Sequence, residues 1–301
     1  MTRLEPGTYH VPVMLAECMN YLAVREGGTY VDATLGGGGH TAELLQRVGP
    51  SGRVISFDAD EAAIEHCTQR FGMGQQGAPP LELIHANFDT MPTVISTYDH
   101  VDGVLFDLGV SSYQFDFHER GFSFRQQAPL DMRFTPSGPT AADLLNSSSP
   151  EAIRTIFRDF GEEPMSRKLA DAVVRRRTLA PIRTTGDLRD VVITNIPPQH
   201  QPKTLARIFQ ALRIAVNDEL GRLERVLQDV LPLLSTGGRC VVMSYHSLED
   251  RIVKNVMRDA HNDGIVQLIT KKPVEASSEE ISRNPRARSA RLRACERIFA
   301  A

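Results

Sequence analysis

The first third of the chain alternates short apolar runs with segments of helical spacing. From Tyr30 to Ser112, runs of apolar and β-branched residues are each followed by an amphipathic stretch or a polar turn. Continuous apolar strands separated by helices predict a parallel sheet that is covered on both faces. Ligands of such sheets bind at the carboxyl ends of the strands. The expected strands lie in TYVDATL, GRVISFDAD, LELIHANF and VDGVLFDLG.

The alternation stops after Ser112 for about a hundred residues, close to the size of a small domain. This segment starts with a turn-rich stretch and then becomes helical. Ser149 and Pro150 are typical helix-start residues, and a second helix is expected in PMSRKLADAVVRRR. We therefore predict an α/β fold with a mostly parallel sheet, in which a discontinuous domain, residues 1–112 and 213–301, is interrupted by a helical insertion domain, residues 113–212.

The pattern after the insertion returns to α/β character. A strand is predicted in GGRCVVMSYHS and an amphipathic helix in LEDRIVKNVMRDA. The segment GIVQLIT is expected to pair with SARLRACERIF, and the polar segment EASSEEISRNPRARS is expected to be a loop.

Composition narrows the class of protein without indicating a function. The 301 residues are 41% hydrophobic and 24% charged, with a formal net charge of -3, which is typical of globular chains and argues against wholesale coating of nucleic acid. The four cysteines form no C-x-x-C pair, so we expect buried thiols and no metal site. No apolar run reaches membrane-spanning length and no basic leader precedes an apolar core, which favours a cytoplasmic protein without a membrane partner.

Four consecutive glycines separate the first expected strand from a helix. They lie in LGGGGHTAELL, where Gly37 to Ala42 satisfy the spacing G-x-G-x-x-A. Glycines at such a turn allow a ligand to touch the main chain beside a helix N-terminus, although a flexible surface turn has the same local sequence. Asp58 ends the next strand, where a carboxylate can accept ribose hydroxyls. Because a new helix starts there, Asp58 is also a candidate N-cap, and both roles can coexist.

Two cofactors, NAD and S-adenosylmethionine, are compatible with this loop. After the third strand, Asn87 and Phe88 offer a small polar side chain and an aromatic ring for adenine, and Asp107 ends the fourth strand. A dehydrogenase would continue with the second half of a dinucleotide fold, whereas this chain enters a helical insertion. The organisation therefore favours methyl transfer from S-adenosylmethionine.

The glycine loop is one of eight segments that match one known family in the family's order. They are HVPVM, GGGGH, DLGVSS, RGFSF, PLDMR, FQALRIAVNDEL, HSLEDRIVK and NPRARSARLR. On these segments the chain resembles the bacterial cytosine N4-methyltransferases that modify the decoding centre of small-subunit (16S) ribosomal RNA. Two departures are that Tyr245 precedes His246 where many relatives have Phe, and that the connection from Gly264 to Ser282 is shorter than in some members.

The resemblance implies a Rossmann-like class I methyltransferase domain and a helical domain that engages the substrate. It also implies S-adenosylmethionine as cofactor and 16S ribosomal RNA as partner, within a small ribosomal subunit or an assembly intermediate, and leaves the oligomeric state open. Gln114 is a site residue on the resemblance alone, because a solvated loop glutamine is the ordinary alternative. The cofactor contacts carried over are Gly38, Gly39, His40, Asp58, Phe88, Asp107 and Gln114.

Methylation of a cytosine amino group needs an acceptor for the amino hydrogens, because the nitrogen lone pair is conjugated into the ring. Many amino-methyltransferases use an Asp/Asn/Ser-Pro-Pro-aromatic stretch after the fourth strand, where this chain has DLGVSS. Asp131 has a structural alternative as the ion-pair partner of Arg133, and His246 has one as a helix cap. The candidate acceptors are Asp107, Ser111, Ser112 and Asp131, with Tyr113 or Phe122 stacking on the base.

Two groups of arginines are candidates for phosphate contacts, although a solvated face is the usual role of such runs. They would serve a substrate whose target base is splayed out of its stack. The candidates are Arg175, Arg176 and Arg177 in the insertion, and Arg283, Arg286, Arg288, Arg291 and Arg293 near the end of the chain.

Three other functions fit parts of the pattern. A methyltransferase acting on another RNA or DNA position would use the same glycine loop and Asp58. An RNA-binding assembly factor would hold the cofactor only as a folding ligand, and an NAD oxidoreductase fits the glycine spacing. Product analysis, transfer of a labelled methyl group and nicotinamide binding distinguish these functions.

Overall fold

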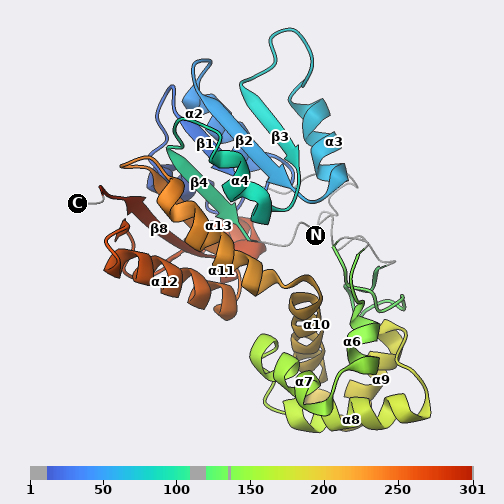
Figure 1. Ribbon diagram of the computed structural model, residues 1–301. Helices are drawn as coiled ribbons and strands as arrows, with labels where there is room; N and C mark the ends of the chain where they lie inside the picture. Colours follow the sequence, from blue (N-terminus) through green and yellow to red (C-terminus); the bar gives the residue numbers. More distant parts are fainter. Residues whose placement is uncertain (1–11, 109–119, 135–136, 300–301) are drawn as a thin grey trace. The chain divides into compact units, whose positions relative to one another are not determined.

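The computed structural model describes residues 12–108, 120–134 and 137–299 (Figure 1). The chain divides into two compact units, an α/β unit of residues 1–109 and 221–301 and a helical unit of residues 110–220. The boundaries expected from the sequence, 112/113 and 212/213, differ from this division most at the second crossing. There Ile208 and Leu212 are buried in the helical core, and the helical unit continues to Leu220.

The α/β unit contains one sheet, with eight strands among the described residues. Its order is β3-β2-β1-β4-β5-β8-β6, and β7 pairs with β8. The first five strands in this order are parallel neighbours, as the apolar runs predict, and β8 lies antiparallel between β5 and β6. The expected pairing of GIVQLIT with SARLRACERIF is confirmed by β6 and β8. The strands are β1 (Thr29–Asp32), β2 (Arg53–Asp58), β3 (Leu81–His85), β4 (Gly103–Asp107), β5 (Arg239–Ser244), β6 (Val266–Leu268), β7 (Val274–Glu275) and β8 (Arg291–Arg297).

Helices cover both faces of this sheet (Figure 1). They include α1 (Leu15–Leu22), α2 (Gly39–Val48), α3 (Glu61–Arg70), η1 (Phe88–Thr90), α4 (Met91–Ile95), α11 (Glu219–Val230), η5 (Leu231–Leu233) and α12 (Ser247–Asn262). Apolar side chains of α11 and α12 share one core with Val31 and Phe106, and those of α1 and α2 share another with Tyr30 and Leu105. Because successive strand residues point to opposite faces, the central strands are buried on both sides.

The segment of residues 275–289 is not the loop that its composition predicts. It contains α13 (Ser278–Arg283) and the 3₁₀ helix η6 (Pro285–Ser289). Ser277 caps α13 by accepting the Glu280 N–H at 3.1 Å, and Glu280 in turn accepts the Met14 N–H at 2.6 Å. These tertiary contacts order a segment whose polar residues are otherwise typical of a turn.

The helical unit has a core of its own, to which helices from α6 to α10 contribute apolar side chains. Ser149 caps α7 by accepting a backbone N–H at 3.2 Å, as the sequence predicts, and Thr140 and Thr184 begin α6 and α9 with capping boxes. The elements are α6 (Ala141–Ser147), α7 (Pro150–Thr155), the π-helical turn η3 (Ile156–Phe160), α8 (Ser166–Leu179), α9 (Thr185–Asn195), η4 (Pro198–His200) and α10 (Gln201–Asn217).

Within the described ranges, no helix is both long and apolar enough to cross a membrane. The same residues hold no group of three or more His, Cys, Asp or Glu side chains that could ligate a metal ion. All four cysteines are buried free thiols, as predicted.

Candidate functional site

The glycine loop joins the carboxyl end of β1 to α2 and is shaped by the protein's own packing. Gly36 and Gly38 have φ of +50° and +73°, a region that favours glycine. A Cβ at Gly38 would lie 2.9 Å from the Cys67 sulfur, and one at Gly39 would lie 3.0 Å from Pro12. The loop therefore has a backbone conformation that favours glycine at Gly36 and Gly38, with little room for side chains at Gly38 and Gly39.

The start of α2 presents backbone donors at the same place. Gly38 is the N-cap residue, so the N–H groups of the first helical turn, from Gly39 onward, have no partner within the helix. A helix N-terminus of this kind favours negatively charged ligand groups.

Asp58, at the carboxyl end of β2, is bound to the glycine loop. Its carboxylate accepts the Gly36 N–H at 2.8 Å and the Asp60 N–H at 2.9 Å. Burial raises the pKa of Asp58 to about 6, against the effect of these two donors. The N-cap of α3 is Asp60, which accepts the Ala62 N–H at 3.0 Å, so the alternative role of Asp58 as that cap is wrong.

Asp60 adds an acceptor that the sequence interpretation missed. Its Oδ1 caps α3, whereas its Oδ2 is buried and has no hydrogen-bond partner among the described residues. A buried acceptor without a donor is costly, and a ligand hydroxyl would satisfy it. The signal in the sequence was the second carboxylate of DAD.

A buried polar cluster lies directly behind the loop. The Thr41 hydroxyl donates to Asp32 at 2.7 Å and lies 2.9 Å from the Ser56 hydroxyl, which ties α2 to β1 and β2. Asp32 is fully buried, and this burial raises the pKa of its carboxyl group. Sequence reasoning also missed Asp32, although it ends a buried strand just before the glycines.

The His40 side chain serves the protein and is not open to a ligand. It is buried, with Nε2 at 3.1 Å from the Val13 carbonyl oxygen and Nδ1 at 3.8 Å from Asp107 Oδ2. A carbonyl oxygen can only accept a hydrogen bond, so His40 Nε2 carries a proton and donates to it. Among the groups of His40, the backbone N–H in the first turn of α2 is the one suited to contact a cofactor.

Asp107 ends β4 with a partly exposed side chain that is fixed by several groups. Its backbone N–H donates to the Thr34 hydroxyl at 2.8 Å, and its Oδ1 accepts the Tyr245 hydroxyl at 2.7 Å. Burial, and then the charge of Asp107, raise the pKa of Tyr245 well above its usual range, so this phenol stays protonated.

Phe88 follows β3 at the same edge of the sheet. It begins η1 and is partly buried, and its ring meets that of Phe106 edge to face at 6.0 Å between centroids. An apolar ring next to a buried core is suited to packing against adenine.

The comparisons with known proteins decide the family. The model of the MraW methylase family matches residues 7–298. The chain belongs to the MraW methylase family. The motif resemblance and the predicted class of enzyme, a methyltransferase, are thereby confirmed.

Curated relatives of this MraW-family chain match over almost their full length. Proteins named ribosomal RNA small subunit methyltransferase H are 45% identical in Koribacter versatilis, covering 96% of this chain and 94% of theirs, and 44% identical in Geobacter sulfurreducens, covering 96% and 99%. A solved rRNA methylase from Streptococcus thermophilus is similar with a TM-score of 0.43 and 15% identity, over 96% of this chain and 99% of that one.

Membership in the MraW family supports S-adenosylmethionine as the methyl donor, as the sequence predicts. The residues at the sheet edge fit this molecule. Asp58 and the unpartnered Asp60 Oδ2 supply acceptors for ribose hydroxyls, and the first turn of α2 supplies donors for a carboxylate. Asp107 also ends a strand at this edge, with Oδ2 not used by Tyr245, and its role as a cofactor contact stays a prediction.

Several candidate residues lie outside the described ranges. They are Ser111, Ser112, Tyr113 and Gln114. Their roles as acceptor, stacking residue or cofactor contact stay predictions.

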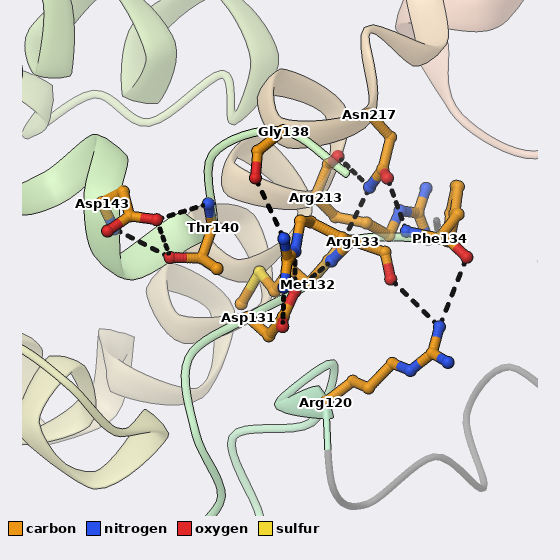
Figure 2. A network of polar contacts seen from close by, with 10 residues as sticks. All are labelled: Arg120, Asp131, Met132, Arg133, Phe134, Gly138, Thr140, Asp143, Arg213 and Asn217. Carbon is orange, nitrogen blue, oxygen red and sulfur yellow. Dashed lines mark hydrogen bonds and ion pairs between the residues drawn. The ribbon is translucent and has the colours of Figure 1, made fainter. Parts of the chain in front are cut away.

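Asp131 belongs to the helical unit and is held in an ion pair (Figure 2). Arg133 donates through Nε to Asp131 Oδ1 at 2.7 Å and through Nη2 to Oδ2 at 2.8 Å. These hydrogen bonds lower the pKa of Asp131, which makes its carboxylate a weaker base. The structural alternative for Asp131 therefore has direct support.

The same segment is joined to α10 (Figure 2). Asn217 donates to the Met132 carbonyl at 2.8 Å and accepts the Phe134 N–H at 2.8 Å, while Met132 has a left-handed φ of +63°. Two motifs of the MraW-family resemblance, PLDMR and FQALRIAVNDEL, thus meet through hydrogen bonds. Phe122 stacks on Phe134 at 5.6 Å between ring centroids, so that ring has a protein partner.

His246 is the N-cap of α12, as its structural alternative predicts. Its Nδ1 accepts the Glu249 N–H at 3.4 Å, and Glu249 Oε2 accepts the His246 N–H at 3.4 Å. This capping box fixes the chain that follows β5.

The arginine candidates differ in exposure and in their partners within the protein. Arg293 is buried and donates to Asp250 of α12 at 2.6 Å, so its predicted phosphate contact is wrong. On β8 its side chain shares the α12 face with Cys295. Arg177 donates to two backbone carbonyls at 2.7 Å, and Arg176 to Asp187 at 3.3 Å. The arginines that stay exposed are Arg175, Arg283, Arg286 and Arg288, while Arg291 is partly exposed.

Proposed function

We propose that this chain transfers a methyl group from S-adenosylmethionine to the exocyclic N4 amine of a cytidine in the decoding centre of 16S ribosomal RNA. The substrate would be a small ribosomal subunit or an assembly intermediate. Relatives at 41–45% identity carry the name ribosomal RNA small subunit methyltransferase H, which supports the class of RNA. The observation that carries the choice of an amine is Asp107, a fixed and partly exposed carboxylate at the end of β4.

The cofactor would be held by the two carboxylates after β2 and by the start of α2. Asp58 and Asp60 accept the ribose hydroxyls, and Phe88 packs against the adenine ring. The backbone N–H groups of Gly39 and His40 bind the carboxylate of the methionine portion. S-adenosylmethionine, when bound, supplies a methyl group on a positively charged sulfur.

The chain's own chemistry is to prepare the amine and receive its proton. The N4 lone pair is conjugated with the cytosine ring, so an acceptor for an amino hydrogen favours the geometry in which the nitrogen attacks. Asp107 Oδ2 accepts this hydrogen and takes the proton as the new N–C bond forms, because Oδ1 is already bound to Tyr245. Ser111 and Ser112 remain candidates for a second contact to the amine.

The helical unit is the proposed element for recognition of RNA. Its exposed Arg175 is a candidate for a phosphate contact, whereas Arg176 and Arg177 are engaged within the unit. A base in folded RNA must leave its stack to reach the sheet edge, at a cost of a few kcal/mol. Contacts to the neighbouring backbone would offset this cost.

The decisive experiment is methyl transfer from labelled S-adenosylmethionine to small ribosomal subunits that lack the modification, followed by mass spectrometry of the nucleosides. We expect N4-methylated cytidine, and a loss of at least about a hundredfold in rate for Asp107→Asn. A different methylated nucleoside would assign the enzyme to another position. Cofactor binding without any transfer would favour the assembly-factor alternative. Naked 16S ribosomal RNA, tested in parallel, identifies the form of the substrate.

A further inference from the structure

We propose that Tyr245 is a positioning residue for methyl transfer, which acts by fixing the carboxylate of Asp107. This inference rests on the proposed function, because it assigns Asp107 to the amine.

The sheet topology brings the two residues together although they are 138 positions apart. β4 and β5 are parallel neighbours, with Asp107 opposite Met243. Tyr245 lies two residues further along the chain, just beyond the end of β5. Its ring packs on the core that α1 and α2 share, and its hydroxyl donates to Asp107 Oδ1 at 2.7 Å.

Both partners of this hydrogen bond are held from behind. The Tyr245 N–H donates at 2.9 Å to Glu249 Oε2, the oxygen that also accepts the His246 N–H in the capping box of α12. The N–H groups of Asp107 and Leu108 donate to the Thr34 hydroxyl at 2.8 Å and to the Met243 carbonyl at 3.0 Å. Because the backbones of both strands are fixed, the orientation of the Asp107 carboxylate depends on its side-chain torsion. The hydrogen bond from the Tyr245 hydroxyl fixes that torsion.

The result is that Asp107 Oδ2 accepts no hydrogen bond from the residues that the structure describes, so it can accept one from a ligand. With Oδ1 bound to Tyr245, Oδ2 lies 3.8 Å from His40 Nδ1. The His40 side chain is buried, with its Nε2 donating to the Val13 carbonyl, whereas the Asp107 side chain is partly exposed. A partly exposed carboxylate oxygen that Tyr245 does not use favours a ligand N–H, as on the target amine.

The first test is Tyr245→Phe, which keeps the ring and removes the hydroxyl. At saturating subunits and cofactor, we expect the single-turnover transfer rate to fall about tenfold, the effect of losing one hydrogen bond to a charged group. The affinity for S-adenosylmethionine, measured by calorimetry, should change less than about twofold. The matched control is Tyr98→Phe, which removes a hydroxyl that donates to Glu82 at 2.5 Å, and it should transfer at the wild-type rate.

The second test is a double-mutant cycle with Asp107→Asn. If Tyr245 acts through Asp107, Tyr245→Phe should have little further effect in the Asp107→Asn background. Equal effects in both backgrounds, or an unchanged rate in the single variant, would overturn the positioning role. So would a loss confined to cofactor affinity, which would assign the pair to cofactor binding. A wild-type protein that transfers nothing to the subunits would instead overturn the proposed function, and this inference with it.

Discussion

The carboxylates of the two units differ in what holds them. At the sheet edge, Asp32 and Asp58 accept backbone N–H and hydroxyl groups, and burial raises the pKa of both. In the helical unit, the side chains of Arg133 and Thr140 donate to Asp131 and Asp143 and lower their pKa. The ionised form of aspartate is thus disfavoured by burial at the sheet edge, whereas hydrogen bonds stabilise it in the helical unit.

This difference distinguishes carboxylates that are suited to bind a ligand from carboxylates that stabilise the fold. A carboxylate whose ionised form is disfavoured by burial gains most when a ligand donates to it, and such groups cluster at binding and catalytic sites. A carboxylate that is already paired with arginine, or used in a capping box, stabilises its own unit and has less to offer a ligand. By this criterion the sheet edge, and not the ion pair of Asp131, is the place for chemistry.

The largest effect on the affinity for the cofactor is expected at Asp58. Asp58→Asn removes the charge and one acceptor at the ribose position, and we expect the affinity for S-adenosylmethionine to fall about thirtyfold, because hydrogen bonds to charged groups contribute about 1.5–3 kcal/mol. Calorimetry measures this directly. The control is Asp102→Asn at the opposite edge of the same sheet, where the carboxylate accepts the Thr29 N–H at 2.9 Å. An unchanged affinity of Asp58→Asn for S-adenosylmethionine would contradict the assignment of the sheet-edge carboxylates to ligand binding.

The pH dependence of cofactor binding sharpens the same point. With the pKa of Asp58 at about 6, the carboxylate is largely protonated at pH 5 and largely ionised at pH 7. Ribose hydroxyls donate to the ionised form, so the affinity should fall as the pH drops through 6, approaching about tenfold per pH unit. Binding should also release protons near pH 6. Asp58→Asn should abolish both effects, and a pH-independent wild type would contradict this assignment.

A smaller effect is expected within the arginine run of the helical unit. Arg177→Ala leaves two backbone carbonyls without their donor and should cost about 1–3 kcal/mol in the free energy of unfolding, measured by denaturant titration. Arg175→Ala should leave stability unchanged and reduce the salt slope of RNA binding by about one. If Arg175→Ala lowered the stability and Arg177→Ala reduced the salt slope, Arg177 would contact RNA and its internal hydrogen bonds would not define its role.

The smallest effect on activity is expected at Asp131. Asp131→Asn should keep the transfer rate and the cofactor affinity within about twofold, because the carboxylate is engaged by Arg133. It should lower the midpoint of thermal unfolding, since the ion pair supports the segment that Asn217 binds. A transfer rate reduced as strongly as in Asp107→Asn would place Asp131 among the acceptors and remove the contrast between the units.

The sequence was sufficient to predict the parallel sheet, the inserted helices and the glycine loop. These follow from local patterns: apolar runs, helix-start residues and consecutive glycines that the backbone conformation requires. The loop expected over residues 275–289 was wrong because its order comes from contacts with distant parts of the unit, such as Glu280 with Met14. Tertiary contacts of this kind override local composition.

The candidate site was predictable in position but not in detail. Asp58 and Asp107 were found because parallel strands align their carboxyl ends. Asp60, and not Asp58, caps α3 because the helix starts later than the apolar pattern suggests. Arg293 was misassigned because the sequence does not show which face of β8 meets Asp250, and Tyr245 was linked to Asp107 only by the pairing of β4 with β5.

The pairing of β4 with β5 also has a consequence for folding during synthesis, because the two strands are made at different times. β4 ends at Asp107 and β5 begins at Arg239, 132 positions later, with the helical unit between them. At about 5–20 residues per second, β4 waits roughly 7–26 s after its own synthesis before its second neighbour emerges from the ribosome. During that interval Val104, Leu105 and Phe106 form an unpaired edge of the kind that promotes aggregation. A helical unit that folds on its own core would shorten the path that β5 must search to reach it.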